Sequence, residues 1–175
     1  METLHPIFVH FPIALLTLYA CIEILSLFIK KWKNNSNLLF MKTILLIVGS
    51  IGSSLASNSG EAAKHAIGLR TLLVERHEFF AGLSTSIFWG LTLFYILKWV
   101  ISESGQHYSL LQKLSGTTKS LIAKIISFIE SYYIIYLGAC VGFFALTITG
   151  ALGGAIVYGK DADVIVQWIV RMVGA

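Results

Sequence analysis

Long apolar runs constrain this chain more than any other feature of its sequence. Of its 175 residues, 56% are hydrophobic and 13% are charged. A typical soluble domain carries about 25% charged residues. Apolar runs of roughly 20 residues are long enough to cross a hydrocarbon core about 30 Å thick. The sequence therefore predicts an all-α integral membrane protein in contact with the lipid bilayer.

Polar stretches divide the apolar sequence into four runs, which predict a four-helix bundle. We expect membrane spans at about 6–29, 38–57, 79–100 and 127–152. The polar stretch 58–78 would connect the second span to the third, and an amphipathic segment at 110–126 would lead into the fourth. Residues 1–160 then form one four-span domain. Residues 161–175 form an amphipathic tail, which we expect to lie along the membrane surface or to dock on a partner.

The basic residues predict the orientation of the bundle. Eight of the 13 fall on one side of the predicted spans: Lys30, Lys31, Lys33, Lys42, Lys98, Lys113, Lys119 and Lys124. The other five, Lys64, Arg70, Arg76, Lys160 and Arg171, fall on the opposite side. Because cytoplasmic loops are enriched in Lys and Arg, both termini are expected on the extracytoplasmic side, which for a bacterial inner membrane is the periplasm. The same distribution explains the basic pI, so nucleic-acid binding is not expected.

Several kinds of chemistry lack their usual sequence signals. Cys21 and Cys140 both fall inside apolar runs, and no Cys-x-x-Cys-His or zinc-finger spacing occurs, which argues against a c-type haem and a zinc finger. No Ser/His/Asp order, phosphate-binding loop or pair of acids points to a hydrolase or transferase. A stand-alone enzyme is therefore less expected than an electron-transfer protein or subunit.

The histidines are the main candidates for a functional site. Residues 4–13 read Leu-His-Pro-Ile-Phe-Val-His-Phe-Pro-Ile, so two histidines and two prolines open the first span. The predicted topology gathers His5, His10, His65 and His77 at the extracytoplasmic end, whereas His107 falls in a cytoplasmic loop. Ionisable residues at membrane depth are usually functional. A metal or haem is the most economical joint explanation of this arrangement.

The expected depth of each histidine separates ligands from supporting residues. His10 and His77 belong to different spans and are the expected cofactor and metal ligands. His5 is five residues from His10, about 140° around a helix, so the two cannot share a face. We expect His5 and His65 to support the site or to bind a second haem, and Arg70 and Arg76, with Lys160, to bind haem propionates. Interfacial anchoring is the simpler interpretation of His5 and of the three basic residues, and it is an equal alternative for His65.

Three segments carry a resemblance to a known family. Residues 4–15 resemble the Leu-His-Pro-x-x-Val-His-Phe-Pro-Ile-Ala-Leu signature of the DUF2231 family of bacterial membrane proteins. The segment 59–63, followed by Glu-Arg-His-Glu at 75–78, is similar to that family's Gly-x-x-Ala connection and to the start of its third span. Residues 149–159 are similar to its closing Gly-x-x-Gly-Gly segment. The resemblance implies a four-span bundle of largely uncharacterised function, often linked to respiratory or redox systems.

The residues leave three functions open. The leading hypothesis is a b-type cytochrome with one haem b, or two, that transfers electrons near the extracytoplasmic face to an extracytoplasmic cytochrome or within a larger respiratory complex. The alternatives are metal-ion binding or transport by the same histidines with Glu61 and Glu78, and a non-catalytic accessory subunit. Glu23 and Glu130 are the only carboxylates near or within the spans, so no continuous ion path is evident.

Overall fold

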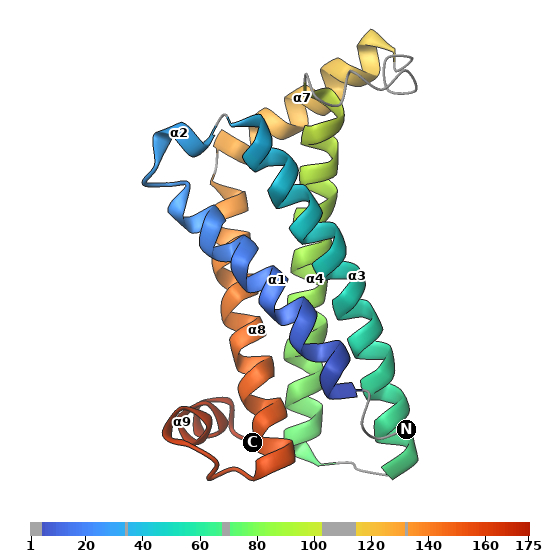
Figure 1. Cartoon of the computed structure of the whole chain (residues 1–175), viewed down its shortest axis with the longest axis vertical. Helices are drawn as coiled ribbons and strands as arrows, with labels where there is room; N and C mark the ends of the chain where they lie inside the picture. Colours follow the sequence, from blue (N-terminus) through green and yellow to red (C-terminus); the bar gives the residue numbers. More distant parts are fainter. Residues whose placement is uncertain (1–4, 34, 68–70, 103–114, 132) are drawn as a thin grey trace.

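The chain folds into helices throughout the part that the structure describes. The computed structural model describes residues 5–33, 35–67, 71–102, 115–131 and 133–175. Four long helices form its body: α1 (His5–Leu25), α3 (Ser36–Ile67), α4 (Leu72–Ile101) and α8 (Ile134–Tyr158). They run alternately up and down in Figure 1. α1 packs against α3 and α8, and α4 packs against the same two helices.

Three shorter helices lie at the two ends of this body. α2 (Lys30–Lys33) is a single turn between α1 and α3, and α7 (Gly116–Ser131) precedes α8. α9 (Val164–Val173) follows α8 at the opposite end (Figure 1). We call the end at which α1 and α4 begin the histidine end, and the end at which α3 and α8 begin the α7 end.

Three of the long helices have the length and composition of membrane spans. These are the segments Ser36–Ala62 of α3, Leu72–Ile101 of α4 and Ile134–Tyr158 of α8. The apolar part of α1, Val9–Leu25, is shorter. Large apolar side chains such as Leu93, Leu137 and Phe144 point outward and are more than half exposed, as expected for helices that face lipid rather than water. The prediction of a multi-pass all-α membrane protein is confirmed at this level.

Small residues lie at the contacts between the long helices. A Cβ atom on Gly49 would come within 2.8 Å of two Leu16 side-chain atoms, and one on Gly52 would lie 3.1 Å from Pro12. Glycine at these positions therefore lets α3 approach α1 closely, which is the usual role of small residues between membrane helices. Gly142 on α8 fills the same role, because its Cβ would lie 3.1 Å from the ring of Phe88 on α4.

The helix boundaries differ from those expected at two connections. α3 continues to Ile67, and α4 begins at Leu72 after the N-cap Thr71, so most of the polar stretch 58–78 is helical. Polar residues outside the hydrocarbon remain compatible with a helix, because polarity alone does not break it. The predicted fourth span begins later than expected, at Ile134, because Tyr133 takes a left-handed conformation (φ 54°) that separates α7 from α8.

The C-terminal tail forms the amphipathic helix that its sequence predicts. Asp163 caps α9 by accepting hydrogen bonds from the backbone N–H groups of Ile165 and Val166. Ile169, with its neighbours on the same face, packs against Leu73 and Leu152 at the histidine end. Trp168 on the other face remains exposed. α9 thus docks on its own bundle through one face.

Candidate functional site

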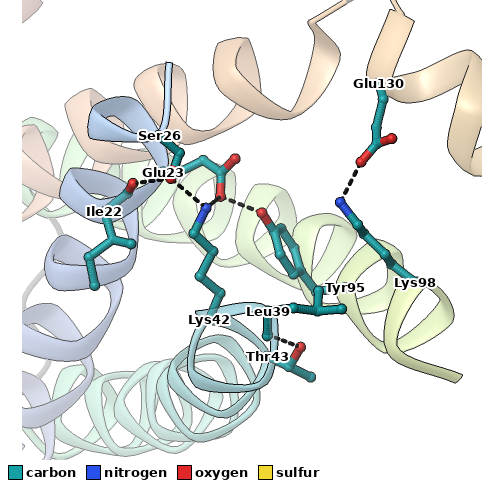
Figure 2. Close-up of polar contacts among 9 residues, drawn as sticks. All are labelled: Ile22, Glu23, Ser26, Leu39, Lys42, Thr43, Tyr95, Lys98 and Glu130. Atoms are coloured by element: carbon teal, nitrogen blue, oxygen red, sulfur yellow. Dashed lines mark hydrogen bonds and ion pairs between the residues drawn. The ribbon is translucent and has the colours of Figure 1, made fainter. Parts of the chain in front are cut away.

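Among the described residues, the most completely buried group of charged side chains lies near the α7 end. Glu23 of α1 and Lys42 of α3 are 3% and 5% exposed, and the Lys42 Nζ lies 2.9 Å from the Glu23 Oε2. The Tyr95 hydroxyl of α4 donates a hydrogen bond to the same Oε2. Lys42 also donates to the Ser26 Oγ at 2.8 Å. We call these four residues the ionic cluster; Figure 2 shows them converging from three chain segments.

Helix geometry explains how the ionic cluster assembles. Glu23 and Ser26 are three residues apart, so they lie on the same side of the chain as it leaves α1. The Ser26 hydroxyl donates to the Ile22 carbonyl at 2.7 Å, which leaves its oxygen to accept the bond from Lys42. The tight packing of α3 on α1 then brings Lys42 within reach. Each charge is therefore matched by a partner from another segment, as burial in an apolar interior requires.

A second ion pair lies beside the ionic cluster. The Lys98 Nζ of α4 is 2.5 Å from the Glu130 Oε1 of α7, and the two side chains are 26% and 34% exposed. A cavity of about 30 Å³ lies between this pair and the ionic cluster; its lining includes Glu23, Lys42, Tyr95, Lys98, Glu130, Tyr133 and Tyr136. A water molecule needs about 10–15 Å³ of such volume. The cavity therefore has room for about two water molecules next to Glu23.

The Tyr19 hydroxyl is a buried polar group on the inner side of the ionic cluster. Tyr19 is fully buried, and its ring lies edge-on to that of Tyr95 with the centroids 5.6 Å apart. The hydroxyl lies close to both Glu23 and Tyr95, yet among the described residues no hydrogen bond to either has good geometry. A buried hydroxyl without a partner costs about 1–3 kcal/mol.

Hydroxyl groups continue toward the middle of the bundle. The Ser50 and Thr92 hydroxyls, from α3 and α4, lie 2.9 Å apart, and Thr92 also donates to the Phe88 carbonyl at 2.7 Å. Farther along, the Trp89 Nε1 donates to the Ser54 Oγ at 3.0 Å. These hydrogen bonds join α3 to α4, and none of them involves a charged side chain.

The histidine end is organised differently. His77 of α4 faces α8, where its Nδ1 lies 3.0 Å from the Thr149 carbonyl oxygen. Because a carbonyl oxygen only accepts, this Nδ1 carries the hydrogen. Gly153, one turn farther along α8, leaves room for the ring: its Cβ would lie 3.3 Å from the His77 Cε1. His77 is therefore positioned by the backbone of a neighbouring helix.

His10, the expected partner of His77, lies on a different side of α1. Pro12 is buried against Gly52 of α3, and His10 is exposed. The two residues are two positions apart, about 200° around the helix, so His10 projects away from the α1–α3 contact. The described contacts of His77 are with α8, and no described contact joins the two histidines.

The other predicted site residues are described less fully. The backbones of His5 and His65 belong to the first turn of α1 and the last turns of α3, which places all four candidate histidines at one end; the side chains of both lie outside the described residues, as do Arg70 and His107. Arg76 and Lys160 are exposed. Among the described residues, no three His, Cys, Asp or Glu side chains are grouped to hold a metal ion.

The two carboxylates that the metal-binding alternative would use form ion pairs with a lysine. The Lys64 Nζ lies 2.7 Å from the Glu78 Oε1 and 3.8 Å from the Glu61 Oε2. Both acids therefore balance the charge of Lys64, which links the end of α3 to the start of α4.

The ionic cluster is not predicted by the sequence. By position, Lys42 is a topology signal of the cytoplasmic side, and Glu23 is one of two carboxylates near the spans. The depth of Glu23 and Lys42 in the bundle could have revealed the pair, because each residue lies within two helical turns of the connection between α1 and α3. No spacing rule links residues on different helices, so the pairing itself required the fold.

Comparisons with known proteins identified no relative of this chain. No family model, curated protein or solved structure matches the chain. The resemblance to the DUF2231 family therefore rests on the residues quoted above.

Proposed function

We propose that the chain is a four-span membrane protein whose histidine end binds haem b and transfers electrons near the extracytoplasmic face. α1 counts as the fourth span because its 21 residues extend about 31 Å, which matches the hydrocarbon thickness. The lysines of α2 and α7 support a cytoplasmic α7 end. Both termini then lie outside the cytoplasm, and the family resemblance implies a bacterial inner membrane.

One observation carries the haem proposal: the hydrogen bond from the His77 Nδ1 to the Thr149 carbonyl. Histidines that ligate metals commonly donate their other ring N–H to a carbonyl or carboxylate, which fixes the tautomer and the ring orientation. The same bond makes Nε2 the nitrogen with the lone pair. The surroundings of His77 therefore fit a haem ligand, and haem would supply reversible one-electron storage there.

The second ligand would come from α1. His10 is exposed, so joint binding with His77 requires the first turns of α1 to rotate toward α4. Pro12 makes this possible, because a proline inside a helix removes the hydrogen bond to the residue four positions earlier and loosens that turn. His5 begins the same helix and is the other candidate on α1. Arg76 and Lys160 are exposed at this end and would pair with the propionates.

A visible spectrum tests this proposal directly. The protein is produced with added haem precursor, purified in detergent and reduced with dithionite. We expect a Soret peak and a sharpened α-band, both lost in His77→Ala and retained in His107→Ala, the matched histidine control from outside the site. A colourless wild-type protein would refute the proposal, and retention of the low-spin spectrum in His77→Ala would refute the assigned ligand.

The same preparation separates the alternatives. Metal binding by the histidines predicts a stoichiometric transition metal in the colourless protein, and its loss in His77→Ala. That alternative is less well supported, because the two carboxylates that it would use already pair with Lys64. An accessory subunit without a cofactor predicts neither haem nor metal.

A further inference from the structure

The ionic cluster calls for an explanation that the histidine end does not supply. Tyr95 and His77 lie on the same helix about 27 Å apart along its axis, so the cluster is not part of the proposed haem site. Replacing a buried ion pair by apolar residues often costs no stability. Stability alone therefore does not explain an ion pair inside a membrane bundle. Charged residues at such a depth usually have functional roles.

The two oxygens of Glu23 have different surroundings. Lys42 and Tyr95 both contact Oε2, and Figure 2 shows the other carboxylate oxygen without a drawn bond. Glu23 also lines the cavity of about 30 Å³. The carboxylate is thus held at one oxygen by two donors, and it borders a space large enough for water.

The cavity connects the buried carboxylate to more exposed groups. Lys98 and Glu130 line it together with Glu23, and both are partly exposed. Water beside Glu23 would therefore be only one ion pair away from the surface at the α7 end. Polar lining on both sides meets the requirement that a buried water find several hydrogen-bond partners.

Tyr19 is an independent observation that points to the same place. Its hydroxyl is fully buried beside the cluster, close to Glu23 and Tyr95 but without a well-formed hydrogen bond among the described residues. Buried hydroxyls are normally paired. A protonated Glu23, or a water molecule beside it, would supply the missing partner.

We propose that Glu23 is a proton-exchanging carboxylate served by water in the cavity. An O–H bond forms at the Glu23 carboxylate as the O–H bond of a hydronium ion in the cavity breaks, which leaves water; release reverses this step. The groups that face Glu23 are Lys42 of α3, Tyr95 and Lys98 of α4, Glu130 of α7, Tyr133 and Tyr136 at the start of α8, and Tyr19 of its own helix. Protonation of Glu23 raises the net charge of the ionic cluster by one unit.

This change has a mechanical consequence. The Glu23–Lys42 attraction joins α1 to α3 at the α7 end, and protonation of Glu23 removes it. Proton uptake therefore weakens the α1–α3 contact at that end, while the Gly49–Leu16 contact holds the middle of the two helices together. The inference does not depend on haem binding and stands if the histidine end proves empty.

Infrared difference spectroscopy of the full-length protein in liposomes tests the proposal. A step from neutral to acidic pH should produce, besides the bands of exposed carboxyl groups, a C=O stretch that belongs to Glu23, and this band should move to lower frequency in D₂O because the site exchanges with bulk water. The band should be lost in Glu23→Gln and retained in Glu130→Gln, the matched carboxylate on the cavity rim. Circular dichroism at each pH establishes that the protein remains folded.

A second variant keeps the test decisive if Glu23→Gln does not fold. Tyr95→Phe removes a donor to Glu23 and preserves the ring, so the carboxyl band should persist at higher frequency. The proposal is overturned if folded wild-type protein shows no carboxyl band in acid, if the band survives in Glu23→Gln, or if it does not respond to either D₂O or Tyr95→Phe.

Discussion

The two ends of the bundle arrange their polar groups in opposite ways. At the α7 end, Glu23, Lys42 and Tyr95 come from three helices and bond to one another in the interior. At the histidine end, His77 bonds to the backbone of α8, and His10 is exposed. The first end is a closed set of mutually dependent charges. At the second end, the two histidines are separate, and a cofactor would have to bring them together.

This difference predicts where substitutions will destabilise the protein. A charge in the ionic cluster depends on its partner, because it is shielded from water. At the histidine end, His77 is held by backbone, His10 is exposed, and the Lys64–Glu78 pair is partly exposed, so the loss of one of these side chains leaves no charge fully buried without a partner. Substitutions at the α7 end should therefore lower the free energy of unfolding by themselves. Substitutions at the histidine end should act mainly by changing the binding of the cofactor.

The largest effect should come from Lys42→Met. This change leaves Glu23 charged and unpaired, which should lower the free energy of unfolding by about 3–5 kcal/mol. The double variant Glu23→Gln, Lys42→Met removes both charges and should recover most of that loss. Reversible denaturant unfolding in detergent, followed by circular dichroism, measures both values. Equal losses in the single and double variants would show that packing, not charge, governs this site.

Tyr95→Phe should have the next largest effect. The hydroxyl donates to a charged carboxylate, and such bonds contribute about 1.5–3 kcal/mol. The ring contact with Tyr19 is preserved, so the loss in unfolding free energy reports the hydrogen bond. Tyr136→Phe, at the cavity rim, is the control and should change stability much less. A similar loss in both variants would argue against a special role for Tyr95.

A matched glycine pair on α8 probes the histidine end. A Cβ at position 153 would press on the His77 ring, whereas one at Gly150 would meet nothing within 4 Å. We expect Gly153→Ala to be less stable than Gly150→Ala by about 1–2 kcal/mol, since overpacking opposes the gain in helix propensity. Thermal unfolding measures the difference. If haem binds, only Gly153→Ala should alter its spectrum, and identical spectra would separate His77 from the haem site.

The smallest effect should come from Lys98→Met. The Lys98–Glu130 pair is partly exposed, and such pairs contribute about 0.2–1 kcal/mol. Salt should reduce the difference from wild type, because exposed charges are screened. Unfolding at low and high ionic strength checks this. A loss as large as that of Lys42→Met would mean that the pair is buried in the membrane-embedded protein and belongs to the ionic cluster.

The sequence predicted some features well because they follow from local rules. Apolar run length indicated the membrane helices. The amphipathic tail became α9, capped by Asp163. Each of these features depends on residues within one helix, so composition and period were sufficient.

Other features were outside the reach of such rules. The break at Tyr133, a non-glycine residue with positive φ, shifted the start of the last long helix because nothing in the residue type marks it. The sequence groups Lys42 with the lysines of the cytoplasmic side, and only its packed position showed it to be a buried partner of Glu23. The direction in which His10 points likewise depended on which face of α1 packs against α3.

The sequence by itself determined that this chain is helical, that it is built for a membrane, and that four histidines fall at one end. Hydrophobic run length and helix period are properties of a single segment, so they can be recognised without knowledge of neighbouring segments. Only the tertiary structure decided which charged groups became partners. A buried charge must be balanced by groups from adjacent helices, and which helices are adjacent is fixed by packing between segments distant in the sequence.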